Sequence, residues 1–281
     1  MSEAWGFAIM PEIFGHDAYS PKEIAERVES IGVAKARLPL GSQITLGILA
    51  GGFIGLGAVY FTLVMSDASL TFAVARLLGG LAFSLGLVLV VIAGAELFTG
   101  NNLLVMAWVS RRISTVELLR NWLIVYLSNF VGALGLVFLV LESKQWHMNG
   151  DAVGVTAIKI AVAKAALPYW DAFFRAVLCN ILVCLAVWLS LAGRSVSDKI
   201  LAIVFPISAF VALGFEHSVA NMFFIPLGIL LKHQLTVPGS EGLSWIALWT
   251  NLFPVTLGNI VGGSVMVALV YRFVYRPVTS A

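Results

Sequence analysis

The chain has 281 residues, of which 60% are hydrophobic and only 11% are charged. About a quarter of the residues in soluble globular domains are charged, so this composition excludes a soluble domain and is typical of a polytopic membrane protein. The formal net charge of +2 gives no indication of a nucleic-acid partner, and we expect the lipid bilayer to surround most of the chain.

The first predicted helix spans residues 20–38. The sequence SPKE at residues 20–23 is a capping box with proline at the first helical position. Ile24, Val28 and Ile31 then follow at helical spacing and give the helix one apolar stripe. We expect an amphipathic helix that lies on the cytoplasmic membrane surface or against a neighbouring subunit. Whether it also closes a pore is left open by the sequence.

Six hydrophobic segments follow, each long enough to cross a bilayer. They lack the alternation of barrel strands, so the predicted fold class is all-α. The predicted spans cover residues 43–65, 71–94 with a continuation to 109, 121–141, 170–192, 200–231 and 246–273.

Two of these spans are interrupted by polar residues, and the interruption is duplicated. Residues 94–101 (GAELFTGN) and 214–221 (GFEHSVAN) share glycine, glutamate and asparagine at a constant offset of 120. Residues 121–132 and 251–262 share asparagines, valines, a leucine and a glycine at an offset of 130. The sequence therefore predicts one transmembrane domain, 1–281, built from a first repeat at 43–141 and a second at 157–275, with spans 2 and 5 broken.

The distribution of Lys and Arg predicts the orientation. Cationic residues gather before span 1, between spans 2 and 3, between spans 4 and 5, and after span 6. By the positive-inside rule, both termini are then cytoplasmic. Three spans per repeat is an odd number, so the second repeat is inverted relative to the first, and the site is expected near the midplane, between the two broken helices.

Polar side chains within these spans are candidates for function, because ionisable groups in a membrane are costly. Glu216 and His217 lie in the second break. Thr99, in the first break, either offers its hydroxyl to a pore or bonds its own preceding turn. Lys164, on a short predicted helix between spans 3 and 4, either snorkels to the membrane surface or attracts an anion. Asn180 and Asn259 either bond a neighbouring helix or line the pore.

No catalytic, metal or cofactor site is expected. The sequence has no His-x-x-x-His or Glu-x-x-His pair to support a metal ion, so an enzyme is not predicted. A water or glycerol channel with the same type of repeat would carry an Asn-Pro-Ala triplet in each half, and none is present. Cys179 and Cys184 are interpreted as small core residues.

From residue 23 to residue 275 the chain resembles the formate/nitrite transporter family. The segments that carry this resemblance are residues 95–99, Lys164 and residues 178–186, 214–222 and 254–259. The resemblance implies an aquaporin-like protomer of six spans, a homopentamer with one pore in each protomer, and a location in the bacterial inner membrane.

The resemblance also assigns roles to individual residues. His217 matches the central pore histidine, Thr99 the facing threonine, Lys164 the entrance lysine, and Glu216 the glutamate that braces the loop. The remaining matches are the central amides Asn180 and Asn259, an outer constriction of Phe83 and Phe210, and an inner constriction of Leu87, Leu97 and Val183.

The substrate class that follows is a small monovalent anion, formate or nitrite, carried with or without a proton. Residues 215–218 with 221–223 resemble the formate branch of the family, whereas residues 163–168 and 173–176 resemble the nitrite branch. Hydrosulfide and short-chain monocarboxylates stay open as alternatives, and so does the choice between channel and proton-coupled carrier. We expect formate transport in which Lys164 concentrates the anion and His217, by donating a proton or a hydrogen bond, shields it between the constrictions.

Overall fold

A computed structural model describes residues 18–275, and within this range the chain is almost wholly helical. The first half holds α1 (Pro21–Ala36), α2 (Leu40–Met65), α3 (Phe72–Phe83), α4 (Leu85–Val88), the π-helix η1 (Leu89–Gly94), the 3-10 helix η2 (Gly100–Leu104), α5 (Val105–Val109) and α6 (Thr115–Glu142). The second half holds η3 (Gln145–His147), α7 (Ala152–Ala165), α8 (Tyr169–Ser190), α9 (Val196–Ala212), α10 (Ser218–Leu231), α11 (Trp245–Ile260), the π-helix η4 (Val261–Leu269) and α12 (Val270–Val274).

Five helical stretches of the described chain are long and apolar enough to cross a membrane. They are Leu40–Met65, Phe72–Gly94, Thr115–Glu142, Tyr169–Ser190 and Trp245–Val274. The all-α prediction with several membrane-length helices is confirmed. The predicted span at 200–231 is divided between α9 and α10, which are 17 and 14 residues long.

Both breaks begin at a glycine with a left-handed backbone. Gly94 has a φ of 85° and Gly214 a φ of 73°, a region that residues with a Cβ enter only at a cost. The chain then runs extended, and η2 and α10 begin after the loop. The glycines therefore let each helix stop inside the molecule and turn its polar loop towards the centre.

The helices α2 and α6 approach so closely that glycine is required on both. A Cβ at Gly51 would lie 2.0 Å from the carbonyl oxygen of Asn129, and one at Gly132 would lie 1.9 Å from that of Ile48. Small residues at such a contact are the usual means by which two membrane helices approach closely.

We expect Gly132→Ala to destabilise the protein by about 1–3 kcal/mol or more, because the new methyl group collides with backbone. Thermal inactivation of the detergent-solubilised protein measures the effect. Gly135→Ala is the matched control on the same helix, since a Cβ there meets nothing within 4 Å. Equal melting temperatures for the two variants would contradict the close packing of α2 and α6.

The helix α1 begins with the predicted capping box, in which the backbone N–H and the hydroxyl of Ser20 both bond Glu23. These bonds hold the pKa of the Glu23 carboxyl below its usual value. The apolar face of α1 was expected on the membrane surface or against another subunit. It instead packs on η2 and α5 of its own chain, with Gly32 against Leu104 and Ala107.

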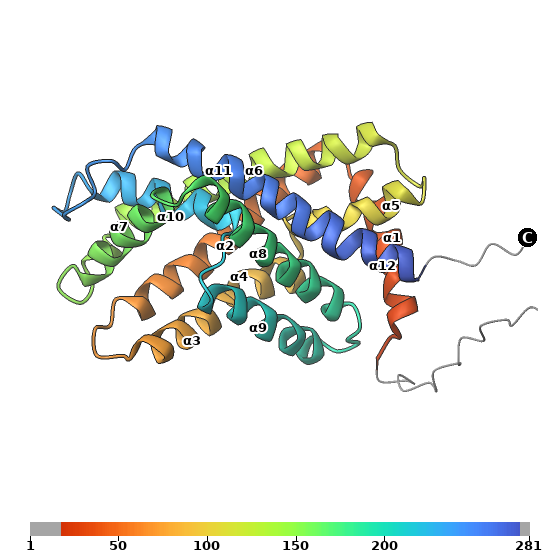
Figure 1. Cartoon of the computed structure of the whole chain (residues 1–281), viewed down its shortest axis with the longest axis horizontal. Coiled ribbons are helices and arrows are strands. Elements are labelled where there is room, and N and C mark those ends of the chain that lie inside the picture. The colour runs from red at the N-terminus through yellow and green to blue at the C-terminus, as the bar shows by residue number, and fades with distance from the viewer. Residues whose placement is uncertain (1–17, 276–281) are drawn as a thin grey trace, which may run out of the picture.

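The two ends of the described chain lie at the same end of the molecule. Figure 1 shows α1 and α12 together at one end of the long axis and α7 at the opposite end. We call these ends the α1 face and the α7 face.

Candidate functional site

The two interrupted loops meet in the interior through one hydrogen-bonded pair. Thr99, before η2, and His217, before α10, are both buried, and Oγ1 of Thr99 lies 3.0 Å from Nε2 of His217. The two residues are 118 positions apart in the chain. The fold therefore places side by side the two central residues proposed from the sequence.

The second ring nitrogen of His217 caps α10. Its Nδ1 accepts the backbone N–H of Ala220 at 3.0 Å, so this nitrogen carries no proton in the neutral ring. The ring proton is then on Nε2 and is donated to Thr99 Oγ1. The hydroxyl proton of Thr99 is left to donate to another group.

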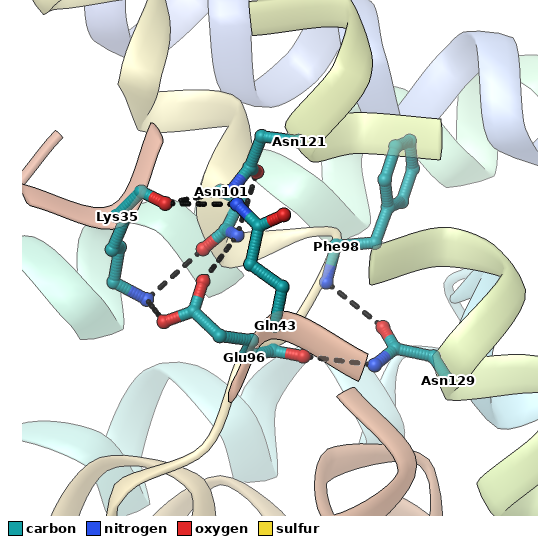
Figure 2. Close-up of polar contacts among 7 residues, drawn as sticks. All are labelled: Lys35, Gln43, Glu96, Phe98, Asn101, Asn121 and Asn129. Carbon is teal, nitrogen blue, oxygen red and sulfur yellow. Dashed lines mark hydrogen bonds and ion pairs between the residues drawn. The ribbon is translucent and has the colours of Figure 1, made fainter. Parts of the chain in front are cut away.

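A buried ionic cluster holds the first loop, and Figure 2 shows it. Lys35 Nζ of α1 lies 2.8 Å from Glu96 Oε1 and 3.0 Å from Asn101 Oδ1. The amide of Asn101 donates to Glu96 Oε2 at 2.7 Å and to Asn121 Oδ1 at 3.0 Å. Asn121 and Gln43 donate to the carbonyl oxygen of Lys35. We call these five residues the Lys35 cluster.

The second loop is held in the same way. Lys164 Nζ of α7 lies 2.9 Å from Glu216 Oε1, and Asn221 donates to Glu216 Oε2 at 2.7 Å. Asn221 also donates to Asn251 Oδ1, and Asn251 donates to the carbonyl oxygen of Lys164, both at 2.8 Å. These four residues form the Lys164 cluster. Each buried carboxylate thus has a cation and an amide as partners. Such partners are needed because an unpaired charge inside a membrane is energetically costly.

One asparagine braces the backbone of each loop. Asn129 accepts the N–H of Phe98 at 2.9 Å and donates to the carbonyl oxygens of Gly47 and Glu96, both at 2.8 Å. Asn259 accepts the N–H of Ser218 at 2.9 Å and donates to the carbonyl oxygens of Ala176 and Glu216 at 2.9 and 3.0 Å. Each side chain therefore satisfies two backbone groups at the interruption and ties them to a carbonyl oxygen of a neighbouring helix, Gly47 of α2 or Ala176 of α8.

Three cavities share walls along the molecule. A cavity of about 200 Å³ lies beside the Lys164 cluster, and one of about 340 Å³ lies beside the Lys35 cluster. Between them is a space of about 10 Å³, close to the least volume that holds one water molecule. Phe83, Phe210 and His217 border both the Lys164 cavity and the small space. Leu87 and Leu97 border both the small space and the Lys35 cavity.

The structure brings most of the predicted site residues together. The small central space is bordered by Phe83, Phe210, Leu87, Leu97, Val183 and His217. Lys164 and Glu216 border the adjoining cavity. Asn259 lies behind the loop as a brace, and Asn180 Nδ2 contacts the carbonyl oxygens of Thr99 and Asn259 at 3.2 and 2.6 Å. The residues that border the three cavities include neither asparagine.

Sequence reasoning missed Lys35. The positive-inside rule counts it only as one of the charges before span 1, although its side chain pairs with the glutamate of the first loop as Lys164 pairs with that of the second. The signal was available, since KARLP at residues 35–39 and KAALP at residues 164–168 share Lys-Ala-x-Leu-Pro. The repeated segments contain the amide partners Asn101, Asn121, Asn221 and Asn251. The repeat alone does not show that these amides surround an ion pair.

Within residues 18–275, no group of three His, Cys, Asp or Glu side chains is placed to hold a metal ion. The polar groups that the site offers are two lysines paired with glutamates, one imidazole, one hydroxyl, and the arginines Arg76 and Arg175 that border the Lys164 cavity.

Comparison with known proteins adds a family and relatives. The model of the formate/nitrite transporter family matches residues 22–273. The chain is 39% identical to the formate channel FocA of Haemophilus influenzae, and 40% identical to FocA of Escherichia coli K12. Each match extends over 271 residues and covers 92% of this chain and 95% of the relative.

A solved structure described as a pentameric formate channel with formate bound has a similar fold. Its TM-score is 0.78 at 40% sequence identity, and the match covers 84% of this chain and 97% of the other. These relatives are channels, which agrees with the prediction that the chain is not an enzyme.

Proposed function

The chain belongs to the formate/nitrite transporter family, and from this premise we propose that it carries formate across the membrane through the row of three cavities in each subunit. The observation that carries the proposal is that His217, hydrogen-bonded to Thr99, is the one polar residue among the described residues that border the narrow central space. His217 would meet a small anion in this space, where apolar side chains such as Phe83, Phe210 and Leu97 surround the anion in place of water.

Desolvation of the anion is the main barrier that such a site must lower. Transfer of a bare carboxylate from water into an apolar medium costs many kcal/mol of free energy. Lys164 and Lys35 give each adjoining cavity a cation, and the anion reaches the apolar rings after leaving one of them. The Thr99 hydroxyl lies one hydrogen bond behind His217 and borders none of the three cavities. We propose that it accepts the His217 Nε2–H and turns its own proton towards the anion as the anion passes.

Two states of His217 would account for passage of the anion without a proton and with one. With Nδ1 occupied by the Ala220 N–H, the neutral ring has one proton and shields the anion without losing it. An imidazolium would point a second N–H at the Ala220 N–H, so protonation requires that the cap of α10 open. We assign passive passage of formate to the capped state, and passage with a proton to the protonated, uncapped state.

The same proposal includes the architecture inferred from the sequence. It comprises six spans in one domain, arranged as two inverted repeats at 43–141 and 157–275, with an aquaporin-like protomer. The matched Lys35 and Lys164 clusters support this duplication. Assembly as a homopentamer is supported by the similarity to the pentameric channel. Many large apolar side chains exposed in the single chain, such as Leu123, Leu127, Val131 and Phe138, would face lipid or neighbouring subunits.

Location in the bacterial inner membrane with cytoplasmic termini completes the proposal. The cationic residues near α1 and α12, together with the position of both elements at one end of the molecule, support this orientation.

Uptake of labelled formate and labelled nitrite by proteoliposomes, over a range of external pH, tests the proposed function. We expect saturable formate uptake that rises as external pH falls, with nitrite a weak competitor. Protein-free liposomes measure the leak of neutral formic acid, which also rises at low pH. Nitrite uptake that dominates and hardly varies with pH would contradict the formate assignment and place the chain with nitrite channels.

A further inference from the structure

The Lys164 cavity and the Lys35 cavity differ in charge. Arg76, Lys164 and Arg175 border the Lys164 cavity together with one carboxylate, Glu216. The Lys35 cavity is bordered by one lysine and one glutamate. At neutral pH, the bordering residues therefore give the first cavity a formal charge of +2 and the second a charge of zero.

The excess charge belongs to the two arginines. Lys164 is paired with Glu216 at 2.9 Å, as Lys35 is with Glu96 at 2.8 Å. Within residues 18–275, neither Arg76 nor Arg175 forms a salt bridge, and Asp171, one turn before Arg175 on α8, pairs with neither.

Arg76 is held in place beside the second loop. Its Nε and Nη2 donate to the carbonyl oxygens of Ala212 and Val211 at 2.9 and 2.8 Å, at the end of α9. A Cβ at Gly214 would lie 3.0 Å from Nη2 of Arg76, so the guanidinium borders the turn that leads to His217. The helix-end carbonyls offset part of its charge, and the fixed orientation lowers the entropy cost of binding an anion.

Arg175 is exposed on α8 at the same cavity. Its backbone carbonyl oxygen accepts the N–H of Glu216, which ties this part of α8 to the second loop. A planar guanidinium with several N–H donors matches the two oxygens of a carboxylate or a similar small oxyanion.

We propose that Arg76 and Arg175 form an anion-binding subsite in the Lys164 cavity, in front of His217, so that the protein binds formate more tightly from the α7 face than from the α1 face. This inference rests on the proposed function, since it deepens the description of the same pathway. At low formate concentration, the subsite makes transport from the α7 face faster than transport from the α1 face, although the pathway conducts in both directions.

Oriented proteoliposomes test the asymmetry. The orientation is determined by protease access to a tag placed after the last residue, and labelled formate is supplied on either face. For the unmodified protein, we expect a half-saturating concentration several-fold lower on the α7 face, with the difference shrinking as ionic strength rises. Arg175→Gln and Arg76→Gln should each raise the half-saturating concentration about 3- to 10-fold on the α7 face and leave it unchanged on the α1 face. Arg76→Lys should raise it less than Arg76→Gln, because the positive charge is kept.

The matched control is Lys159→Gln, which removes an exposed cation of α7 that does not border the cavity. Equal half-saturation on the two faces of the unmodified protein would overturn the proposal. So would an effect of Lys159→Gln as large as that of Arg175→Gln, because general surface charge would then explain it. If Arg76 had a purely structural role, Arg76→Gln would lower the stability of the protein or raise the half-saturating concentration on both faces, and not on the α7 face alone.

A second measurement separates this inference from the proposed function. Thermal stabilisation of the purified protein by sodium formate, relative to sodium gluconate at equal ionic strength, reports binding without transport. Stabilisation that Arg175→Gln removes, in a protein that carries no formate, would contradict the proposed function and support the subsite. Formate transport without any arginine-dependent stabilisation or asymmetry would support the function and overturn the subsite.

Discussion

Formate uptake by the His217→Asn variant is expected to be about 10- to 100-fold lower than that of the unmodified protein and to lose its rise at low external pH. Asparagine is a favoured N-cap residue, so its side-chain oxygen can still accept the Ala220 N–H and keep α10 in place. The variant lacks the Nε2–H that polarises Thr99. Loss of a hydrogen bond that acts on a charged group costs about 1.5–3 kcal/mol, which corresponds to this range of rates.

The measurement is labelled formate uptake in proteoliposomes across external pH, with assembly checked by size-exclusion chromatography. His233→Asn, an exposed histidine after α10, is the control and should leave uptake unchanged. Thr99→Val, which keeps the side-chain volume and removes the hydroxyl, should lower uptake without altering assembly. If His217→Asn keeps the normal rate and the normal pH profile, His217 is only a helix cap.

Replacing Asn259 with alanine is expected to prevent accumulation of a folded protein. The side chain satisfies the N–H of Ser218 and the carbonyl oxygens of Ala176 and Glu216, all buried. The Ala176 carbonyl oxygen keeps its bond within α8, so two buried groups, the Ser218 N–H and the Glu216 carbonyl oxygen, lose their partner. Each costs about 1–3 kcal/mol, so the loss is roughly 2–6 kcal/mol, a large part of the stability of many proteins.

The yield of monodisperse protein after detergent extraction, and its Tm where any is recovered, measure this effect. Asn129→Ala should behave in the same way, because Asn129 makes the equivalent three bonds in the first loop. Gln234→Ala removes an exposed amide and should match the unmodified protein. An Asn259→Ala protein with normal yield and normal Tm would show that water or another group replaces the amide.

Several features of the fold follow from local sequence. Length and apolar composition decide which segments become membrane-length helices, because every backbone group in a bilayer must be bonded within its own helix. The breaks at residues 94–101 and 214–221 are visible because glycine and charged residues interrupt otherwise apolar runs. The duplication is visible because equivalent loops keep the same residue types at a constant offset.

The sequence by itself therefore determined the helices, the two breaks, the repeat and the candidate residues Thr99, Lys164, Glu216 and His217. Tertiary structure alone decided that Thr99 bonds His217 across 118 positions and that Lys35, on a helix outside the predicted spans, pairs with Glu96. It also decided that Asn259 braces a loop and that α1 packs on its own chain. The physical reason is that these contacts join segments far apart in the chain, so their partners depend on how the helices pack. For Lys35 alone, the Lys-Ala-x-Leu-Pro that it shares with Lys164 marks an equivalent position, although this pattern does not name Glu96 as its partner.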